Sequence, residues 1–129
     1  MNKLISSLMQ LSHQAEQAFN NSAGNQSVCQ LHKQGQVTNG LKYYEARDYV
    51  IRQILKTARD EQATWEKIIQ NLDQIDTKHL ALKNSLILTS PDWQSYVAGA
   101  LSMVADIRSL LAETYERINF KMGREGVDD

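Results

Sequence analysis

The hydrophobic pattern is clearest between residues 41 and 88, a stretch that contains neither Gly nor Pro. Its apolar residues recur at alternating steps of three and four, which is the spacing of one face of an α-helix. The positions on this ladder are Ile51, Ile54, Ala58, Trp65, Ile68, Leu72, Ile75, Leu82 and Leu86. Glu61 and His79 are polar positions on the same ladder, and residues 89–91 form a stop signal. The pattern predicts a helix much longer than average.

Two versions of this long helix remain open at the level of sequence. An unbroken helix of 48 residues would span about 72 Å, which exceeds the diameter of a compact domain of this chain length. Alternatively, the helix breaks near residues 73–77, because Asn, Asp and Thr are weak helix formers and Asp76 is a suitable N-cap. We therefore expect a helix over residues 41–72 that either continues or restarts over residues 77–88.

A first amphipathic helix is expected over residues 2–20. Apolar residues again recur at steps of four and three, at Leu4, Leu8, Leu11, Ala15 and Ala18. Residues 21–40 begin with turn-favouring Asn, Ser and Gly and contain few aliphatic side chains. They are expected to form a loop, and a short helix starting at Ser27 is the alternative to a plain loop.

The last helix is the best delimited and is expected over residues 91–120. Ser90 suits the N-cap, Pro91 the first helical position, and Asp92 the positive end of the helix dipole. Its apolar ladder consists of Trp93, Val97, Ala100, Val104, Ile107, Leu111 and Ile118. Because its connection to the preceding helix is short, we expect it to pack antiparallel against the end of the central stretch. Residues 123–129, with two Gly and three acids, are expected to be a flexible tail.

These elements predict an all-α fold, an elongated or up-and-down helical bundle that forms a single domain over residues 1–122. One Pro and six Gly supply too few turns for a β-sandwich or barrel. A length of 129 residues with 42% hydrophobic and 22% charged residues is ordinary for one folded domain.

Small side chains are concentrated on the first half of the last helix, at Ala98, Gly99, Ala100, Ser102 and Ala105. Small residues allow two helix backbones to approach closely. The cluster therefore indicates a close helix crossing, which lies either within the chain or across the interface of a homodimer.

The cellular compartment is predicted from three features. Cys29 is the only cysteine, which excludes an internal disulfide and fits a reducing compartment. The apolar run over residues 4–11 is interrupted by Ser and Gln, unlike the core of a signal peptide. There is no run of about 20 apolar residues, so no membrane span is expected. The sequence predicts a cytoplasmic protein without a membrane partner.

Basic residues suggest one binding surface on the central stretch. Four cations lie on one predicted helix, the last three at positions i, i+4 and i+7: Arg47, Arg52, Lys56 and Arg59. Such a stripe can follow a phosphate backbone, and the neighbouring Tyr43 could stack on bases, as could Tyr44 and Tyr49. However, Asp48 and Asp60 lie four residues from Arg52 and Lys56, where ion pairs form. A solvated face with local ion pairs is therefore favoured, and a net charge of −1 also disfavours nucleic acid.

The string from His79 to Ser85, HLALKNS, resembles the motif of His-containing phosphotransfer domains, which are helical bundles of similar length. That family carries a surface His, a Leu two residues later, a Lys three residues later and then a Gly. Here Lys83 follows by four residues and Asn84 occupies the next position. The resemblance implies that His79 is a phosphoacceptor. The position of His79 on the apolar ladder favours the alternative, a partly buried histidine between helices.

Motifs for metal binding, cofactor binding or nucleophilic catalysis are missing. Cys29 and His32 have the spacing of half a zinc site, but a structural zinc needs four ligands and no second Cys exists. Phosphate-binding Gly-rich loops and nucleophile motifs are also missing. We therefore expect a non-enzymatic adaptor, chaperone or inhibitor, without cofactor, that binds a protein partner or a second copy through a helix face. A nucleic-acid accessory role is the alternative, and phosphotransfer is the remote one.

Overall fold

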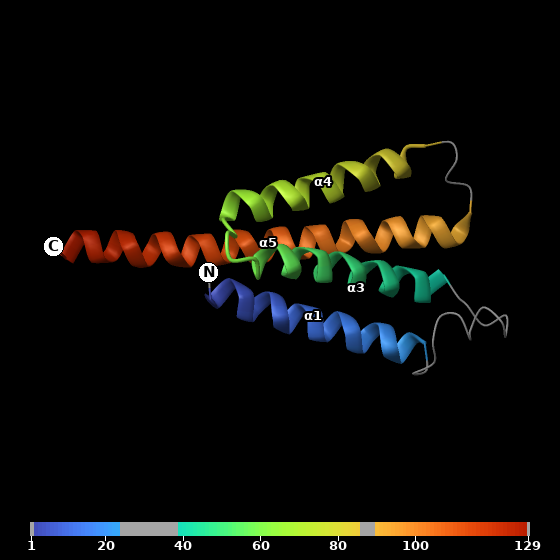
Figure 1. The fold of residues 1–129 in the computed structure, drawn as a ribbon, viewed down its shortest axis with the longest axis horizontal. Coiled ribbons are helices and arrows are strands. Elements are labelled where there is room, and N and C mark those ends of the chain that lie inside the picture. Colours follow the sequence, from blue (N-terminus) through green and yellow to red (C-terminus); the bar gives the residue numbers. More distant parts are fainter. Residues whose placement is uncertain (1, 24–38, 86–89, 129) are drawn as a thin grey trace.

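The computed structural model describes residues 2–23, 39–85 and 90–128, with side chains described up to residue 115 except that of Asn39. These residues form four helices: α1 (Asn2–Ser22), α3 (Asn39–Ala58), α4 (Trp65–Lys83) and α5 (Pro91–Asp128). The helices run alternately up and down (Figure 1), and no strand occurs within the described ranges. The predicted all-α helical bundle is therefore confirmed.

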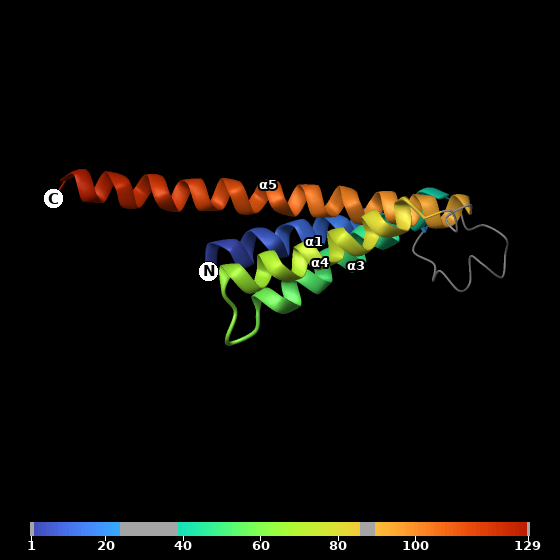
Figure 2. The same ribbon diagram turned by 90° about the horizontal axis from the view of Figure 1, so that it is seen from above.

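The centre of the bundle is the pair of parallel helices α3 and α5, which share the most extensive contact. Helices α1 and α4 each pack against both members of this pair and do not touch each other. Figure 2 shows that α3 and α5 converge at the end where both begin and separate toward the other end. Helix α5 lies antiparallel to α4, as the short connection between them predicts.

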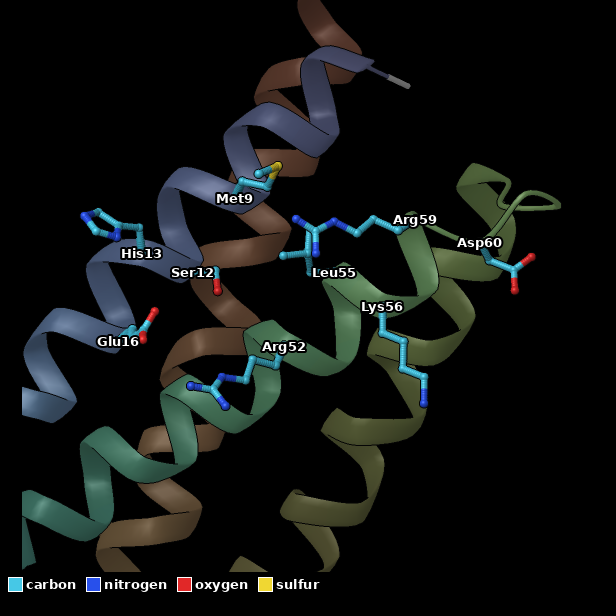
Figure 3. A pocket seen from close by; sticks show the side chains of 9 residues that line it. All are labelled: Met9, Ser12, His13, Glu16, Arg52, Leu55, Lys56, Arg59 and Asp60. Carbon is cyan, nitrogen blue, oxygen red and sulfur yellow. The ribbon is translucent and has the colours of Figure 1, made fainter. Parts of the chain in front are cut away.

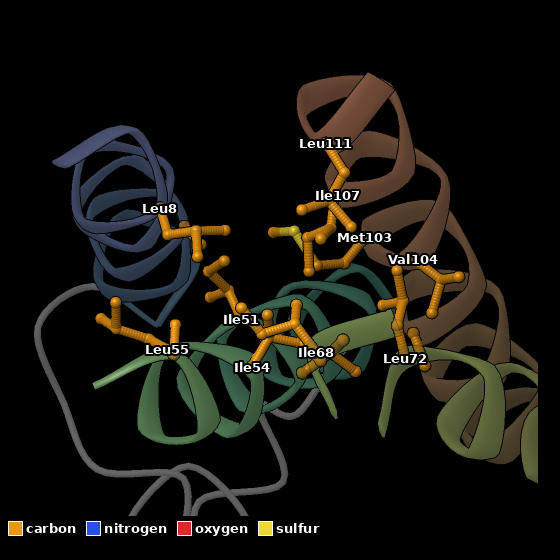
Figure 4. Packing of buried hydrophobic residues seen from close by; sticks show 14 of the residues in the cluster. Leu8, Ile51, Ile54, Leu55, Ile68, Leu72, Met103, Val104, Ile107 and Leu111 are labelled. Atoms are coloured by element: carbon orange, nitrogen blue, oxygen red, sulfur yellow. The ribbon is translucent and has the colours of Figure 1, made fainter. Parts of the chain in front are cut away.

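One apolar core joins all four helices (Figure 4). Its largest fully buried side chains include Leu4 and Leu8 of α1, Ile51 and Ile54 of α3, Ile68 and Leu72 of α4, and Met103 and Ile107 of α5. Full burial of one such side chain stabilises the fold by about 1.5–3 kcal/mol. The predicted apolar ladders of the first, central and last helices thus supply most of this core.

The central stretch breaks at residues 59–64, and the prediction of a break at residues 73–77 is wrong. Helix α3 ends at Ala58, and the Asp60 side chain then accepts a hydrogen bond from the backbone N–H of Gln62 at 2.9 Å. Thr64 caps α4 with extended backbone angles, and its hydroxyl accepts from the Lys67 N–H at 3.2 Å. Side-chain hydrogen bonds to the backbone make this turn without Gly or Pro, and Glu61 lies in the connection.

Contacts with the other helices explain why residues 73–77 stay helical. Arg108 of α5 bonds the carboxylates of Asp73 at 2.9 Å and Asp76 at 3.0 Å. The pKa of the Arg108 guanidinium is raised, mainly by the hydrogen bond with Asp73. Asn71 also donates to the Thr57 hydroxyl of α3. These contacts offset the weak helix propensity of the Asn and Asp residues.

The helix ends differ from the prediction in four places. Helix α4 ends at Lys83 with Asn84 as its C-cap, whereas the sequence predicts a helix to residue 88. Helix α1 extends to Ser22 and α3 begins at Asn39, within two residues of the predicted boundaries. Helix α5 continues to Asp128, whereas the sequence predicts an end near residue 120 and a tail from residue 123. Two Gly residues in this part cost a helix only about 1 kcal/mol each, so they do not by themselves end it. The alternative short helix starting at Ser27 lies outside the described residues.

Helices α3 and α5 cross in very close contact at Gly99. An ideal Cβ atom on Gly99 would lie 2.1 Å from the backbone oxygen of Tyr43, well inside van der Waals contact. The close helix crossing that the small residues predict is therefore present within the chain. Ala98 and Ala105, which belong to the same group of small residues, are exposed.

Candidate functional site

The residues of the predicted basic stripe fall into two groups with different surroundings. Tyr43 donates a hydrogen bond to the Ser102 hydroxyl at 2.9 Å. The Arg47 guanidinium donates to the same hydroxyl at 2.5 Å and pairs with the Asp106 carboxylate at 2.7 Å. Tyr43 and Arg47 therefore join α3 to α5 and are partly buried.

The other three cations, Arg52, Lys56 and Arg59, line a groove of about 530 Å³ between α1 and α3 (Figure 3). The remaining lining residues are Met9, Ser12, His13, Glu16, Leu55 and Asp60. Figure 3 shows Arg59 extending toward α1 and Lys56 pointing away from it. The groove thus combines three cations with two acids, and its net positive charge is small.

Of the two ion pairs predicted along this stripe, one forms and the other does not. Arg52 pairs with the Asp48 carboxylate at 3.0 Å, as their spacing on one helix predicts. Among the described residues, Lys56 forms no ion pair with Asp60 or any other acid within 4 Å. The spacing fails there because α3 ends at Ala58, so Asp60 leaves the helical register.

Asp48 is a buried carboxylate between α1 and α3, with only 4% of its surface exposed. Its Oδ1 atom is the only buried side-chain nitrogen or oxygen without a hydrogen-bond partner in the described part of the chain. Burial raises the pKa of Asp48 above its ordinary value of 3.8; the charge of Arg52 lowers it, and that of Glu16 raises it further. The ionised form of Asp48 therefore opposes folding.

The variant Asp48→Asn is expected to have a higher free energy of unfolding than the wild type at pH 7. The raised pKa means that Asp48 contributes stability below about pH 3.8, and this contribution is lost as the pH rises through the pKa of the folded state. The difference between variant and wild type should therefore vanish near pH 3. Urea unfolding over a pH series measures it. A variant less stable than wild type at pH 7 would show that the ion pair with Arg52 outweighs burial.

A second opening, here called the aromatic cleft, lies where α3 begins, α4 ends and α5 begins. Its volume is about 710 Å³. Its lining residues are Lys42, Glu45 and Tyr49 of α3, Lys78, His79 and Leu82 of α4, and Ser90, Asp92, Trp93 and Tyr96 of α5. Three large apolar side chains on its walls are exposed to solvent: Tyr49 by 52%, Leu82 by 37% and Trp93 by 57%.

His79, the candidate phosphoacceptor, is buried at the edge of this cleft, with 6% of its surface exposed. Its Nδ1 atom lies 2.7 Å from the backbone oxygen of Ile75. Its ring stacks on that of Tyr96, with centroids 6.4 Å apart and an angle of 29° between the planes. The phosphotransfer resemblance implies a surface histidine, but this one is held in the wall of a cleft.

Aromatic rings continue from His79 along the wall that α5 forms. Trp93 meets Tyr96 edge to face, with ring centroids 5.8 Å apart. Burial raises the pKa of the Tyr96 hydroxyl, and the nearby charge of Glu45 adds to the effect. Tyr96 therefore stays protonated and neutral at physiological pH.

Charges on the cleft walls are balanced. Lys42 pairs with Glu45 at 3.3 Å. Lys78 and Asp92 also line the cleft, and neither forms an ion pair within 4 Å among the described residues. Two lysines and two acids give a formal charge of zero when His79 is neutral. Shape and aromatic surface, rather than charge, distinguish the aromatic cleft.

The sequence pattern does not reveal the aromatic cleft. Trp93 and Leu82 lie on apolar ladders, which predict that they face the core, but both are exposed. Trp93 lies in the first turn of α5 and Leu82 in the last turn of α4, where the facing helices no longer cover them. A ladder assigns residues to a face of a helix and cannot show how far along that face the neighbouring helices extend.

Comparison with protein families, curated proteins and solved structures finds no match for this chain. The fold defines its class as an all-α up-and-down bundle. Within the described ranges, no helix combines the length and apolar character that crossing a bilayer requires. The same residues contain no group of three or more His, Cys, Asp or Glu side chains arranged to hold a metal ion.

Proposed function

We propose that this is a small, non-enzymatic interaction protein of the cytoplasm that binds a segment of another protein in the aromatic cleft. The observation that carries the proposal is the exposure of Trp93 and Tyr49 on the walls of a cleft of about 710 Å³. Trp and Tyr are enriched at protein interfaces and dominate their binding energy. A single cysteine, Cys29, suits a reducing compartment.

The balanced charges specify the kind of partner. Because Lys42, Glu45, Lys78 and Asp92 sum to zero, a strongly acidic or basic segment gains little in the aromatic cleft. A segment anchored by an apolar or aromatic side chain gains more, since it covers Trp93 and Leu82. Binding should therefore change little between low and high salt, because screening weakens mainly exposed charge pairs.

A library of random peptides displayed on phage tests the proposal, because selection from it requires no candidate partner. We expect selection on the wild-type protein to enrich sequences that share an apolar or aromatic anchor. Trp93→Ala should weaken the affinity of synthetic copies of these peptides by about 30-fold, as loss of a central interface aromatic does. Trp93 is 57% exposed, so this variant should keep the thermal unfolding midpoint of the wild type.

Tyr115→Ala is the matched control, because Tyr115 lies on the same helix with 58% of its surface exposed and does not line the cleft. Its affinity for the peptides should equal that of the wild type. Failure to enrich any shared sequence, or equal binding by Trp93→Ala, would refute the proposal. If the wild type self-associates and Trp93→Ala abolishes this association, the occupant of the cleft is a second copy of the chain rather than a segment of another protein.

Nucleic-acid binding in the groove between α1 and α3 has weaker support. Arg47 and Tyr43 are engaged with α5, and Glu16 and Asp60 lie among the remaining cations. Binding of generic DNA or RNA at about 50 mM salt, with a steep salt dependence, would identify this groove, rather than the aromatic cleft, as the main binding surface. The double variant Arg52→Glu and Arg59→Glu would then abolish binding.

A further inference from the structure

The tautomer of the neutral His79 ring is determined by its contact within α4. A backbone carbonyl can only accept a hydrogen bond, so at 2.7 Å from the Ile75 oxygen the Nδ1 atom must carry the proton. The neutral ring then has an unprotonated Nε2 atom, whose lone pair is an acceptor. The fold thus selects one of the two neutral forms of this histidine.

The Nε2 acceptor is available to a ligand. No hydrogen bond to it occurs in the described part of the chain. Since Nδ1 is bonded back to its own helix and the His79 ring lines the aromatic cleft, Nε2 is the ring nitrogen that remains for a ligand in the cleft.

The surroundings of Nε2 favour a flat aromatic group with a hydrogen-bond donor on its edge. The rings of Tyr96 and Trp93 extend the wall next to His79, and Tyr49 lies on the facing helix. A lone pair repels an anion such as a phosphate group. A cation would meet Lys42 and Lys78 as well as Glu45 and Asp92. A neutral hydrogen-bond donor avoids both the repulsion between an anion and the lone pair and the repulsion between a cation and the two lysines.

We propose that the aromatic cleft holds a tryptophan side chain of the partner segment, with its indole N–H donating to His79 Nε2. This inference rests on the proposed function, because it names the side chain that anchors the partner in the same cleft. Indole fits the chemistry better than phenol, since its nitrogen only donates. Its flat rings can pack against Trp93 and Tyr96 edge to face or offset.

Indole and 1-methylindole are probes that differ in the donor alone. We expect both to shift the amide NMR resonances of Tyr49, Trp93 and Tyr96, with indole binding about fivefold more tightly, the contribution of one hydrogen bond. In His79→Asn the short amide can still donate to the Ile75 oxygen but offers no acceptor at the Nε2 position. This variant should bind both probes equally.

His79→Gln is the matched control, because its longer side chain can place an amide oxygen near the Nε2 position. It should keep the preference for indole over 1-methylindole. Equal affinity of the two probes for the wild type, or a preference that survives in His79→Asn, overturns this inference. If peptides selected on phage bind through Trp93 but lack tryptophan, only this inference fails. If neither the peptides nor the two indole probes bind at the cleft, the proposed function fails as well.

Discussion

The variant Gly99→Ala should lower the free energy of unfolding by about 2 kcal/mol, the typical cost of overpacking a tight contact. The added methyl group would lie 2.1 Å from the Tyr43 oxygen and 2.9 Å from the Tyr43 carbonyl carbon. Both are backbone atoms of α3, so no side-chain rotation relieves the clash and the two helices must separate. Urea unfolding followed by circular dichroism measures the loss.

The sign of this result is informative, because helix propensity alone predicts the opposite. Alanine stabilises a helix interior by about 1 kcal/mol relative to glycine. Ala98→Leu is the control, since Ala98 is the exposed neighbour on the same helix and should change stability by less than about 0.5 kcal/mol. If Gly99→Ala proved as stable as the wild type or more so, α3 and α5 would not cross as closely as described.

Arg47→Ala should cost about 2 kcal/mol, because it removes a hydrogen bond and an ion pair that connect two helices. Only 18% of the Arg47 side chain is exposed, and its partners Ser102 and Asp106 lie on α5. The change would leave the Ser102 hydroxyl with fewer partners. Chemical unfolding of Arg47→Ala, Asp106→Ala and the double variant would give the coupling between the two charges.

Arg59→Ala is the matched control for this prediction. Arg59 belongs to the same predicted stripe, but it is exposed and lines the groove between α1 and α3. Its removal should change stability by less than about 0.5 kcal/mol. Equal effects of the two substitutions would mean that the bonds of Arg47 to α5 contribute nothing to stability in solution.

Periodicity was sufficient to predict most of the fold. Steps of three and four identify the buried faces of α1, α4 and α5, because each of these helices buries one stripe. Helix α3 contacts all three of the others and also buries Ala46, Val50 and Leu55, which lie outside its predicted ladder. The cap at Ser90 to Asp92 also locates the start of α5 closely. These features are local, so the residues that carry them lie next to one another in the sequence.

The break in the central stretch was misplaced because competing long-range contacts decide it. Residues 73–77 have the weaker helix composition, but Arg108, which is 35 residues from Asp73, holds them in α4. The break instead occurs where Asp60 and Thr64 bond the backbone. Side-chain caps of this kind can be recognised in a sequence, but a search for Gly and Pro misses them.

The candidate site was predicted only in part, for the same reason. Arg52, Lys56 and Arg59 share one groove, as their spacing on one helix predicts. Arg47 and Tyr43 depart from the stripe because Ser102 and Asp106 lie within reach on a helix more than 50 residues away. The aromatic cleft combines the ends of three helices, so no single segment of the sequence contains its pattern.

The length of α5 separates the aromatic cleft from the end of the chain. Trp93 lies in the first turn of this helix, and the helix continues past the rest of the bundle to Asp128 (Figure 1), about 50 Å farther along its axis. Helix α1 also begins at the end of the bundle away from the cleft. A surface, a fluorophore or a fused domain attached before α1 or after α5 would therefore leave the aromatic cleft open for binding.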